Sequence, residues 1–217
     1  MTATTANDTA PAGRYLALGD SYTIGEGVPA ADTWPFQLAA ALRTRGIALE
    51  DPQVIATTGW TTDELAAAID AAAPQGPFAL VSLLIGVNNQ YRGRPLAEYR
   101  QQFEQLLQRA IALAGEDARR VLVLSIPDWG MTPFAHEHGR EAATVAREID
   151  DFNAAAHACC GDYNVAFVDI TPASRAQGAE PAMVVDDGLH PSAAMYALWA
   201  EQALPVAAER LATPAAP

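Results

Sequence analysis

Five short runs of apolar residues are spaced along the chain, and each is continuous rather than alternating with polar positions. They cover residues 15–19, 53–57, 78–85, 121–126 and 165–170. Continuous apolar runs of this length are typical of strands that are buried on both faces. The pattern therefore predicts five buried strands.

The stretches between these runs repeat apolar residues at helical spacing. We expect helices over residues 33–45, from Thr61 onward, and over residues 96–114, 145–156 and 192–211. Thr61 followed by Glu64 has the form of a capping box, which marks the start of a helix. Strands that alternate with helices imply right-handed crossovers and a parallel sheet between two helical layers.

The composition fits one domain of this kind. The chain has 217 residues, of which 50% are hydrophobic and 18% charged, so it can bury a large core and is not globally disordered. No break in composition marks a second domain. We expect a disordered N-terminal tail over residues 1–13, one domain over residues 14–212 and a C-terminal tail over residues 213–217.

The net charge and the lack of targeting signals disfavour several classes of binding partner and of location. Lys and Arg number 13 and Asp and Glu number 26, so the net charge is −13 and disfavours nucleic acids and anionic membranes. The apolar run at residues 78–85 is far shorter than the ~20 residues of a membrane helix. Residues 1–13 lack the basic and apolar parts of a secretory signal. We therefore expect a cytoplasmic protein that acts on a small molecule.

Polar residues follow the predicted strands at the edge where ligands of parallel sheets bind. Ser21 follows the first strand and would be a nucleophile if a base took its proton. His190 is the candidate base. Asp187, three residues earlier, can accept the imidazole Nδ1–H and leave Nε2 for Ser21.

Donors for an oxyanion lie at the same edge. The backbone N–H groups of Ser21 and Gly59 and the side-chain amide of Asn88 follow three different strands. One such donor typically lowers a barrier by about 2.7–4 kcal/mol. Together with the proposed base, these groups form a complete acyl-transfer site.

Four motifs carry a resemblance to a known family. They are Gly19-Asp20-Ser21-Tyr22, the isolated Gly59, Gly86-Val87-Asn88-Asn89 and Asp187-Gly188-Leu189-His190. The order and content of these motifs resemble the SGNH hydrolases, also called GDSL esterases/lipases, in their lysophospholipase-like esterase branch. The resemblance implies a flavodoxin-like three-layer α/β/α sandwich, a five-stranded parallel sheet of order 2-1-3-4-5, and no cofactor.

The same resemblance assigns roles to individual residues. It implies Ser21 as nucleophile, Gly59 and Asn88 as oxyanion donors, and His190 as the base supported by Asp187. The chain departs from the family pattern at Tyr22, where leucine is usual, and at Asn89, where aspartate is usual. We interpret position 22 as a packing site, and we expect the change at position 89 to alter local hydrogen bonds rather than catalysis.

Several of these residues also have purely structural interpretations. Ser21 could be a helix N-cap, and Gly59 and Asn88 could be turn residues. Asp20 is interpreted as a carboxylate that binds loop amides, and Asp186 as a solvated charge. His136 and His138 have no third ligand at workable spacing, so no metal site is expected.

Substrate contacts are assigned to aromatic residues at the same edge. Trp60 and Trp129 are candidates for lining an acyl pocket, with core packing an equally open alternative. The sequence favours a serine esterase for carboxylic esters, with thioesters and lysophospholipids as further candidate substrates. An acyltransferase or perhydrolase that uses the same site, and a non-catalytic flavodoxin-like binding module, are the alternatives.

Overall fold

One five-stranded parallel sheet forms the centre of the molecule in the computed structural model, which describes residues 12–212. Its strands run in the order β2-β1-β3-β4-β5 and are all parallel. The strands are β1 (Tyr15–Gly19), β2 (Gln53–Ala56), β3 (Leu80–Leu84), β4 (Val121–Leu124) and β5 (Ala166–Val168). Each strand lies within a predicted run, and the predicted strand order is confirmed.

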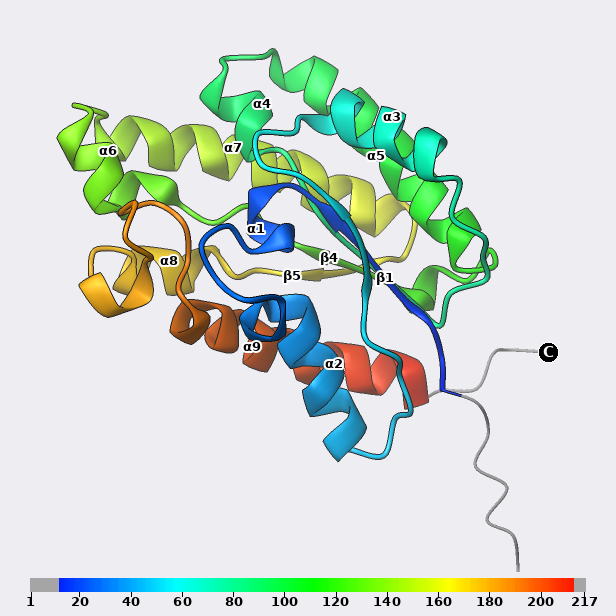
Figure 1. The fold of residues 1–217 in the computed structure, drawn as a ribbon. Coiled ribbons are helices and arrows are strands. Elements are labelled where there is room, and N and C mark those ends of the chain that lie inside the picture. Colours follow the sequence, from blue (N-terminus) through cyan, green and yellow to red (C-terminus); the bar gives the residue numbers. More distant parts are fainter. Residues whose placement is uncertain (1–11, 213–217) are drawn as a thin grey trace, which may run out of the picture.

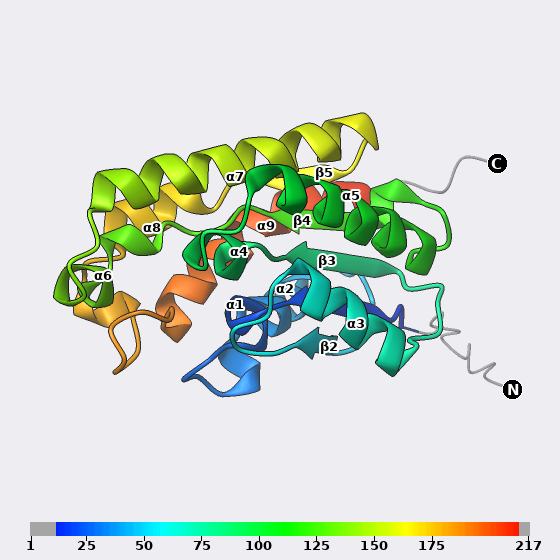
Figure 2. The ribbon, with the colours of Figure 1, turned by 90° about the horizontal axis from the view of Figure 1, so that it is seen from above.

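Helices cover both faces of the sheet, as Figures 1 and 2 show. One layer contains α2 (Trp34–Thr44) and α9 (Ala193–Ala212), which pack against each other. The other layer contains α3 (Thr62–Ala72), α5 (Leu96–Leu113) and α7 (Ala142–Asp162). Every residue of β1, β3 and β4 is buried between these layers. The predicted three-layer sandwich is therefore confirmed.

The long helices follow the sequence signals that predicted them. The capping box before α3 forms, because Glu64 accepts a hydrogen bond from the Thr61 N–H at 2.8 Å. The apolar stripe of α5, which includes Tyr99, Phe103 and Leu106, is buried. Each helix therefore presents one apolar face to the sheet.

Four short α-helices follow strands at the carboxyl edge of the sheet, and the apolar pattern gave no bounds for them. They are α1 (Ser21–Ile24), α4 (Val87–Tyr91), α6 (Pro133–Glu137) and α8 (Thr171–Gln177). Four 3₁₀ turns complete the described elements: η1 (Ala30–Asp32), η2 (Ala118–Arg120), η3 (Trp129–Met131) and η4 (Pro181–Met183). Segments of this length contain too few turns for an apolar repeat to reveal them.

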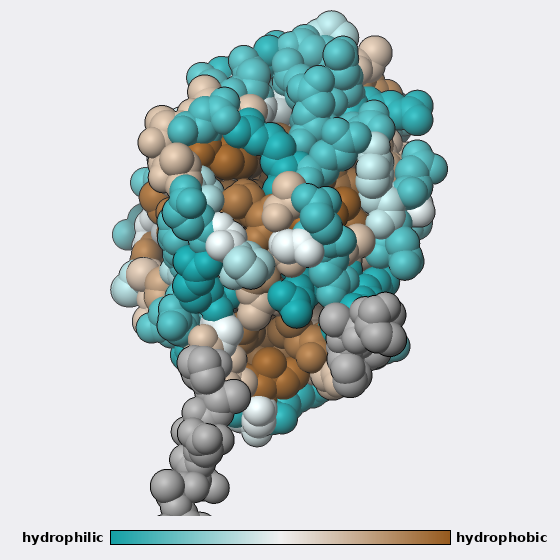
Figure 3. All heavy atoms as spheres, turned by 90° about the vertical axis from the view of Figure 1, so that its right-hand side faces the viewer, coloured by the Kyte–Doolittle hydropathy of each residue, from teal (hydrophilic) through white to brown (hydrophobic). Residues whose placement is uncertain are grey.

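The amino-terminal edge of the sheet lies on the opposite side of the molecule, and Figure 3 shows that its surface is largely hydrophilic with smaller apolar spots. Gly13, which was expected in the tail, pairs with Leu49 in an isolated parallel bridge. The rest of the two expected tails, residues 1–11 and 213–217, lies outside the described residues. No helix within residues 12–212 has the length and apolarity needed to cross a membrane.

Candidate active site

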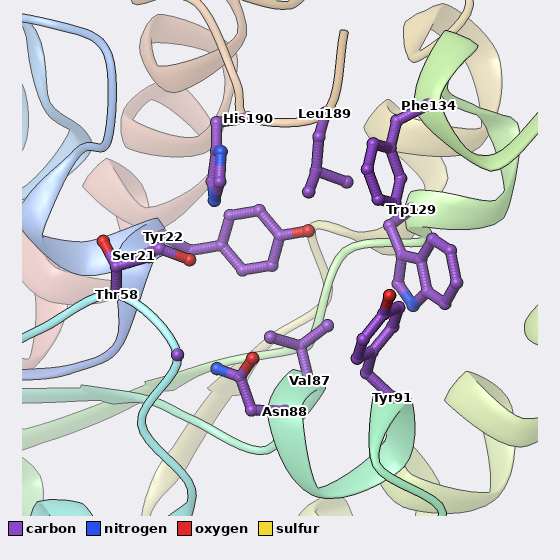
Figure 4. A pocket seen from close by; sticks show the side chains of 11 residues that line it. Ser21, Tyr22, Thr58, Val87, Asn88, Tyr91, Trp129, Phe134, Leu189 and His190 are labelled. Carbon is purple, nitrogen blue, oxygen red and sulfur yellow. The ribbon is translucent and has the colours of Figure 1, made fainter. Parts of the chain in front are cut away.

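A cavity of about 220 Å³ opens at the carboxyl edge of the sheet, where α1, α4, α6 and the loop before α9 meet. Figure 4 shows how side chains from these separate segments point into it. Its lining residues are Ser21, Tyr22, Thr58, Gly59, Val87, Asn88, Tyr91, Trp129, Phe134, Leu189 and His190. The cavity thus brings together five residues that the sequence singled out, from segments far apart in the chain: Ser21, Gly59, Asn88, Trp129 and His190.

Ser21 stands at the first position of α1, directly after a tight turn from β1. The turn requires Gly19, because a Cβ there would lie 2.5 Å from the Leu84 carbonyl oxygen. Asp20 caps the helix: its carboxylate accepts the Tyr22 N–H at 3.0 Å, and its carbonyl accepts the N–H of Thr23, also at 3.0 Å. Within residues 12–212 the Ser21 N–H has no such partner and is therefore available to a ligand.

Asp20 itself is fully buried, as its structural interpretation requires. Burial raises the pKa of Asp20 to about 7, although the nearby backbone amides of Tyr22 and Gly86 oppose the change. Its Oδ2 atom has no hydrogen-bond partner within the described chain. The carboxylate that shapes the Ser21 turn is therefore held in an environment unfavourable to its charge.

Gly59 occupies the third position of a turn that follows β2. The Trp60 N–H donates to the Thr57 carbonyl at 3.3 Å, and Gly59 has φ = +86°, a conformation that favours glycine at this turn position. Arg92 Nη2 donates to the Gly59 carbonyl at 2.6 Å and fixes the peptide. In the part of the chain that the structure describes, the Gly59 N–H also has no partner.

Asn88 enters the cavity from the first turn of α4. One N–H of its side-chain amide donates to the Trp60 carbonyl at 2.9 Å, which fixes the direction of the amide group. Figure 4 shows the amide on the cavity side opposite His190. Since an amide nitrogen carries two hydrogens, the second N–H is left for a bound group.

Asn89, next to it, points away from the cavity and is fully buried. Its Oδ1 accepts the Thr62 N–H at 3.1 Å, and its Nδ2 donates to Thr62 Oγ1 at 2.8 Å. The Thr62 hydroxyl donates in turn to Gln102. Because the threonine proton is used, its oxygen needs a donor, which asparagine supplies and an ionised aspartate does not. This network accounts for the departure at position 89.

Asp187 and His190 form a close pair in the loop before α9. His190 Nδ1 lies 2.6 Å from Asp187 Oδ2, while Asp187 Oδ1 accepts the N–H groups of Leu189 at 2.8 Å and His190 at 2.9 Å. Burial tends to raise the pKa of Asp187, but the hydrogen bond with His190 and those two amides outweigh it and hold the pKa below its usual value. Asp187 is therefore ionised at neutral pH.

The His190 ring packs against the ring of Tyr22. Tyr22 makes an edge contact with it at a centroid distance of 5.9 Å and makes a similar contact with Trp199. Figure 4 shows a ring nitrogen of His190 directed toward Ser21 and Tyr22. No hydrogen bond joins Ser21 Oγ to His190 in the described chain; such bonds are often long without substrate and tighten when it binds.

An aromatic wall closes the far end of the cavity. Trp129 is held there because its Nε1 donates to Gln90 Oε1 at 2.8 Å. Tyr91 packs on its edge with ring centroids 5.3 Å apart, and the Arg140 guanidinium lies over both rings, at 5.1 Å from Trp129 and 5.4 Å from Tyr91. Phe134 completes the wall, and its N–H donates to the Gly188 carbonyl at 3.0 Å.

Of the two tryptophans expected to contact substrate, only Trp129 lines the cavity. Trp60 is partly buried against the hydrophobic core and contributes its backbone carbonyl, which orients Asn88. The Trp60 side chain does not line the cavity, and its contact with substrate stays a prediction. Tyr22 lines the cavity as well, although the sequence indicated only a packing role.

Metal ligands do not gather in the described part of the chain: residues 12–212 contain no cluster of three His, Cys, Asp or Glu side chains able to hold an ion. His136 and His138 lie at the exposed end of α6. Cys159 and Cys160 are buried and free.

The sequence profile of the GDSL-like Lipase/Acylhydrolase family matches residues 17–198, which includes the end of β1, the other four strands and every lining residue described above. The chain belongs to this family. Membership in the GDSL-like lipase/acylhydrolase family makes the protein a carboxylic ester hydrolase. A comparison with curated proteins gives no significant match.

Solved structures share the fold of this GDSL-like hydrolase. TesA is 23% identical with a TM-score of 0.69, and the match covers 91% of this chain and 99% of TesA. A lipase/acylhydrolase from Enterococcus faecalis is 20% identical with a TM-score of 0.67, covering 94% of this chain and 100% of that one. The psychrotrophic esterase EstA from Pseudoalteromonas sp., solved in a form inhibited by monoethylphosphonate, is 16% identical with a TM-score of 0.64, covering 92% and 94%.

Proposed function

We propose that the protein hydrolyses carboxylic esters through a covalent acyl-enzyme on Ser21. The Ser21 oxygen attacks the ester carbonyl while His190 Nε2 takes its proton. His190 then gives that proton to the leaving alcohol, and a water molecule activated by His190 releases the acid and restores Ser21. Asp187 holds the tautomer and stabilises the imidazolium that forms.

Three N–H donors would stabilise the oxyanion of the tetrahedral intermediate. These are the backbone N–H groups of Ser21 and Gly59, which have no partner within residues 12–212, and the second N–H of the Asn88 amide. Each donor is fixed before the substrate arrives: Ser21 by the Asp20 cap, Gly59 by its turn and Arg92, and Asn88 by the Trp60 carbonyl. Donors of this kind need no reorganisation at the moment of reaction.

The observation that carries this proposal is the pair formed by His190 and Asp187 at the mouth of a cavity that also holds Ser21. A histidine whose Nδ1 is engaged by a carboxylate has its Nε2 free to act as a base. A helix cap alone would explain Ser21, but it would not explain why this pair and three fixed donors border the same cavity. Hydrolysis accounts for all of them together.

The cavity favours an acyl group of short to medium length. Its volume of about 220 Å³ is below the ~300–1,000 Å³ of pockets that bury drug-sized ligands. The wall formed by Tyr91, Trp129 and Phe134 ends it. We expect activity to peak at the shorter members of an acyl series from acetate to palmitate.

The direct test replaces the proposed nucleophile and base and follows release of 4-nitrophenol from 4-nitrophenyl butyrate. Ser21→Ala and His190→Ala are each expected to lower kcat by at least about 10³-fold while the melting temperature stays near that of the parent. His157→Ala is the matched control, because His157 is exposed on α7 away from the cavity. Parental activity in Ser21→Ala would contradict the proposal.

A further inference from the structure

The side chain of Tyr22 has an unusual position in this cavity. The residue is 3% exposed, yet its hydroxyl has no hydrogen-bond partner within residues 12–212. The hydroxyl is also not sealed in the protein interior, because Tyr22 borders the cavity. Figure 4 shows the ring crossing the cavity with its oxygen directed toward Leu189 and the aromatic wall.

The surroundings of this hydroxyl are apolar. Val87 and Leu189 flank the middle of the cavity, and Phe134 stands beyond them. The Trp129 indole N–H is already used by Gln90. A group bound between the reacting end and the far wall therefore meets the fixed Tyr22 hydroxyl among mostly hydrocarbon surfaces, and the second phenol of the lining, Tyr91, stands in the wall itself.

The tyrosine is held rigidly in this place. Its N–H is bound by the Asp20 carboxylate at 3.0 Å, and its carbonyl accepts the Trp34 indole N–H at 3.1 Å. Its ring contacts His190 and Trp199, both at 5.9 Å. The hydroxyl cannot turn out to bulk water. A group bound in the cavity therefore either forms a hydrogen bond with this hydroxyl or leaves it unpaired.

Tyr22 remains a hydrogen-bond donor over the whole working range of an esterase. Burial, followed by the nearby Asp20 and Asp187 carboxylates, raises the pKa of Tyr22 well above its usual value. A neutral phenol can donate to an ether, hydroxyl or carbonyl oxygen. The complementary ligand feature is therefore an oxygen atom, a few bonds from the carbonyl that Ser21 attacks.

The acyl half of the ester is the part assigned to this position. The acyl group stays bound while the alcohol departs and water enters, so an enclosed cavity holds it through both steps. The alcohol needs only to reach the mouth beside His190. Rigid walls around the acyl group keep the intermediate aligned for attack by water.

We propose that Tyr22 is a specificity-determining residue whose hydroxyl donates a hydrogen bond to an oxygen within the acyl chain, so that the enzyme selects oxygen-bearing acyl groups over plain alkyl groups of equal length. This inference rests on the proposed function and defines its substrate class. An alkyl chain leaves the buried hydroxyl unpaired, and sites built to bind a polar group discriminate against analogues that lack it.

The test uses pairs of 4-nitrophenyl esters in which one oxygen replaces one methylene. The pairs are methoxyacetate with butanoate, 3-methoxypropanoate with pentanoate, and 4-methoxybutanoate with hexanoate. They move the oxygen one bond at a time along the chain. The preference in each pair is the ratio of kcat/KM values divided by the same ratio for hydroxide-catalysed hydrolysis, which removes intrinsic reactivity.

The parent enzyme is expected to prefer the oxygen-bearing ester in at least one pair. Tyr22→Phe, which keeps the ring and removes only the hydroxyl, is expected to lower kcat/KM for that ester roughly 3- to 10-fold, the range of one net hydrogen bond. For the alkyl partner it is expected to raise kcat/KM, because the hydroxyl that an alkyl chain leaves unpaired is gone. The corrected preference then disappears.

Tyr196→Phe is the matched control. Tyr196 lies in the same aromatic cluster, packs on Trp199 and has a buried hydroxyl without a partner, but it does not line the cavity. It is expected to retain the parental preference.

Two results would overturn the inference. The first is a parent enzyme that shows no corrected preference in any pair, and this result counts even if Tyr22→Phe fails to fold. The second is a Tyr22→Phe variant that changes kcat/KM equally for both members of each pair. Failure of the proposed function would appear separately, as activity retained in Ser21→Ala.

Discussion

The two sides of the cavity differ in how completely their buried polar atoms are paired. Behind the proposed nucleophile and base, the part of the chain described here leaves four fully enclosed side-chain atoms without a hydrogen bond, in addition to the cavity-facing Tyr22 hydroxyl: Asp20 Oδ2, Thr23 Oγ1, Tyr196 Oη and Trp199 Nε1. They belong to the turn after β1, to α1, or to α9. On the opposite side, the buried polar side chains of Gln90, Asp128 and Trp129 are all paired.

The pairing on the wall side forms a connected network. Gln90 accepts from Trp129 and donates to Glu148 at 2.6 Å. Asp128 accepts the Gly130 N–H at 2.9 Å and forms an ion pair with Arg175 at 2.9 Å. These bonds tie the loop after β4 to α4, α7 and α8, so the wall is a stable template for the cavity.

The contrast indicates that the two sides of the cavity have different roles, one in catalysis and the other in stability. Unpaired buried polar atoms are rare in folded proteins, and each one lowers the stability of the fold. Their concentration behind Ser21 and His190 therefore indicates that this region is less stable than a fully paired one would be. The wall supplies stability that offsets this. Substitutions on the catalytic side should therefore change rate more than stability, and those on the wall should do the reverse.

Among the groups that support the proposed nucleophile and base, the largest expected effect comes from Asp187→Asn. The change keeps the size of the side chain but removes the acceptor that fixes the His190 tautomer, so kcat should fall about 10²–10⁴-fold with little change in KM. Asp186→Asn is the matched control, because Asp186 is exposed and makes no described hydrogen bond to His190. Steady-state kinetics on both variants decide the matter. Equal losses would contradict the assignment of Asp187.

A smaller effect on kcat is expected from a substitution of Asn88, and a substitution of the neighbouring Asn89 serves as the comparison. Asn88→Ala should lower kcat about 10²–10³-fold, because one oxyanion donor is lost, with little change in melting temperature. Asn89→Ala should mainly lower the melting temperature, since the Asn89 side chain hydrogen-bonds the N–H and the hydroxyl of Thr62 at the start of α3. Kinetics and thermal unfolding measured on both variants test this. Reversed effects would show that the donor is misassigned.

The smallest effect, on stability alone, is expected from two buried aspartates on opposite sides of the cavity. Asp20→Asn removes a charge that burial disfavours and should raise the melting temperature at pH 8. Asp128→Asn breaks the pair with Arg175 and should lower it. A change of 1 kcal/mol corresponds to a shift of about 2–4 °C in a chain of this size. Destabilisation by both variants would refute the contrast between the two sides.

The gain in Asp20→Asn should depend on pH in a defined direction. The folded pKa of Asp20 is raised to about 7 from its usual 3.8. Well below the usual pKa of 3.8 the carboxyl is protonated in both the folded and the unfolded chain. As pH rises toward 7 the unfolded chain ionises first, so the parent loses stability across this range. The difference between Asp20→Asn and the parent should therefore be small at pH 4 and reach its full size by pH 8.

The sequence predicted the features that depend on neighbouring residues. The strands appeared as apolar runs, and the start of α3 appeared as the Thr61 capping box. The turns at Gly19 and Gly59 are set by local backbone requirements, so short motifs were sufficient to find Ser21, Gly59 and Asn88. The pairing of Asp187 with His190 followed from their spacing of three residues.

The sequence did not predict the features that depend on distant packing. Trp129 lines the cavity because Gln90, 39 residues away, holds its indole, whereas Trp60 turns into packing. The position of Tyr22 in the cavity depends on Trp34, His190 and Trp199 together. No local pattern encodes such contacts, so aromatic residues at the sheet edge could not be divided between pocket and core.

The most direct test of the central claim is covalent capture of the nucleophile. EstA from Pseudoalteromonas sp., which shares the fold, was solved in a form inhibited by monoethylphosphonate. An activated ethylphosphonate ester should add one ethylphosphonyl group per chain, abolish esterase activity in proportion, and be found by peptide mass spectrometry on Ser21. Ser21→Ala should show no adduct under the same conditions. An adduct of equal yield on Ser21→Ala, or modification of another residue with loss of activity, would contradict the account.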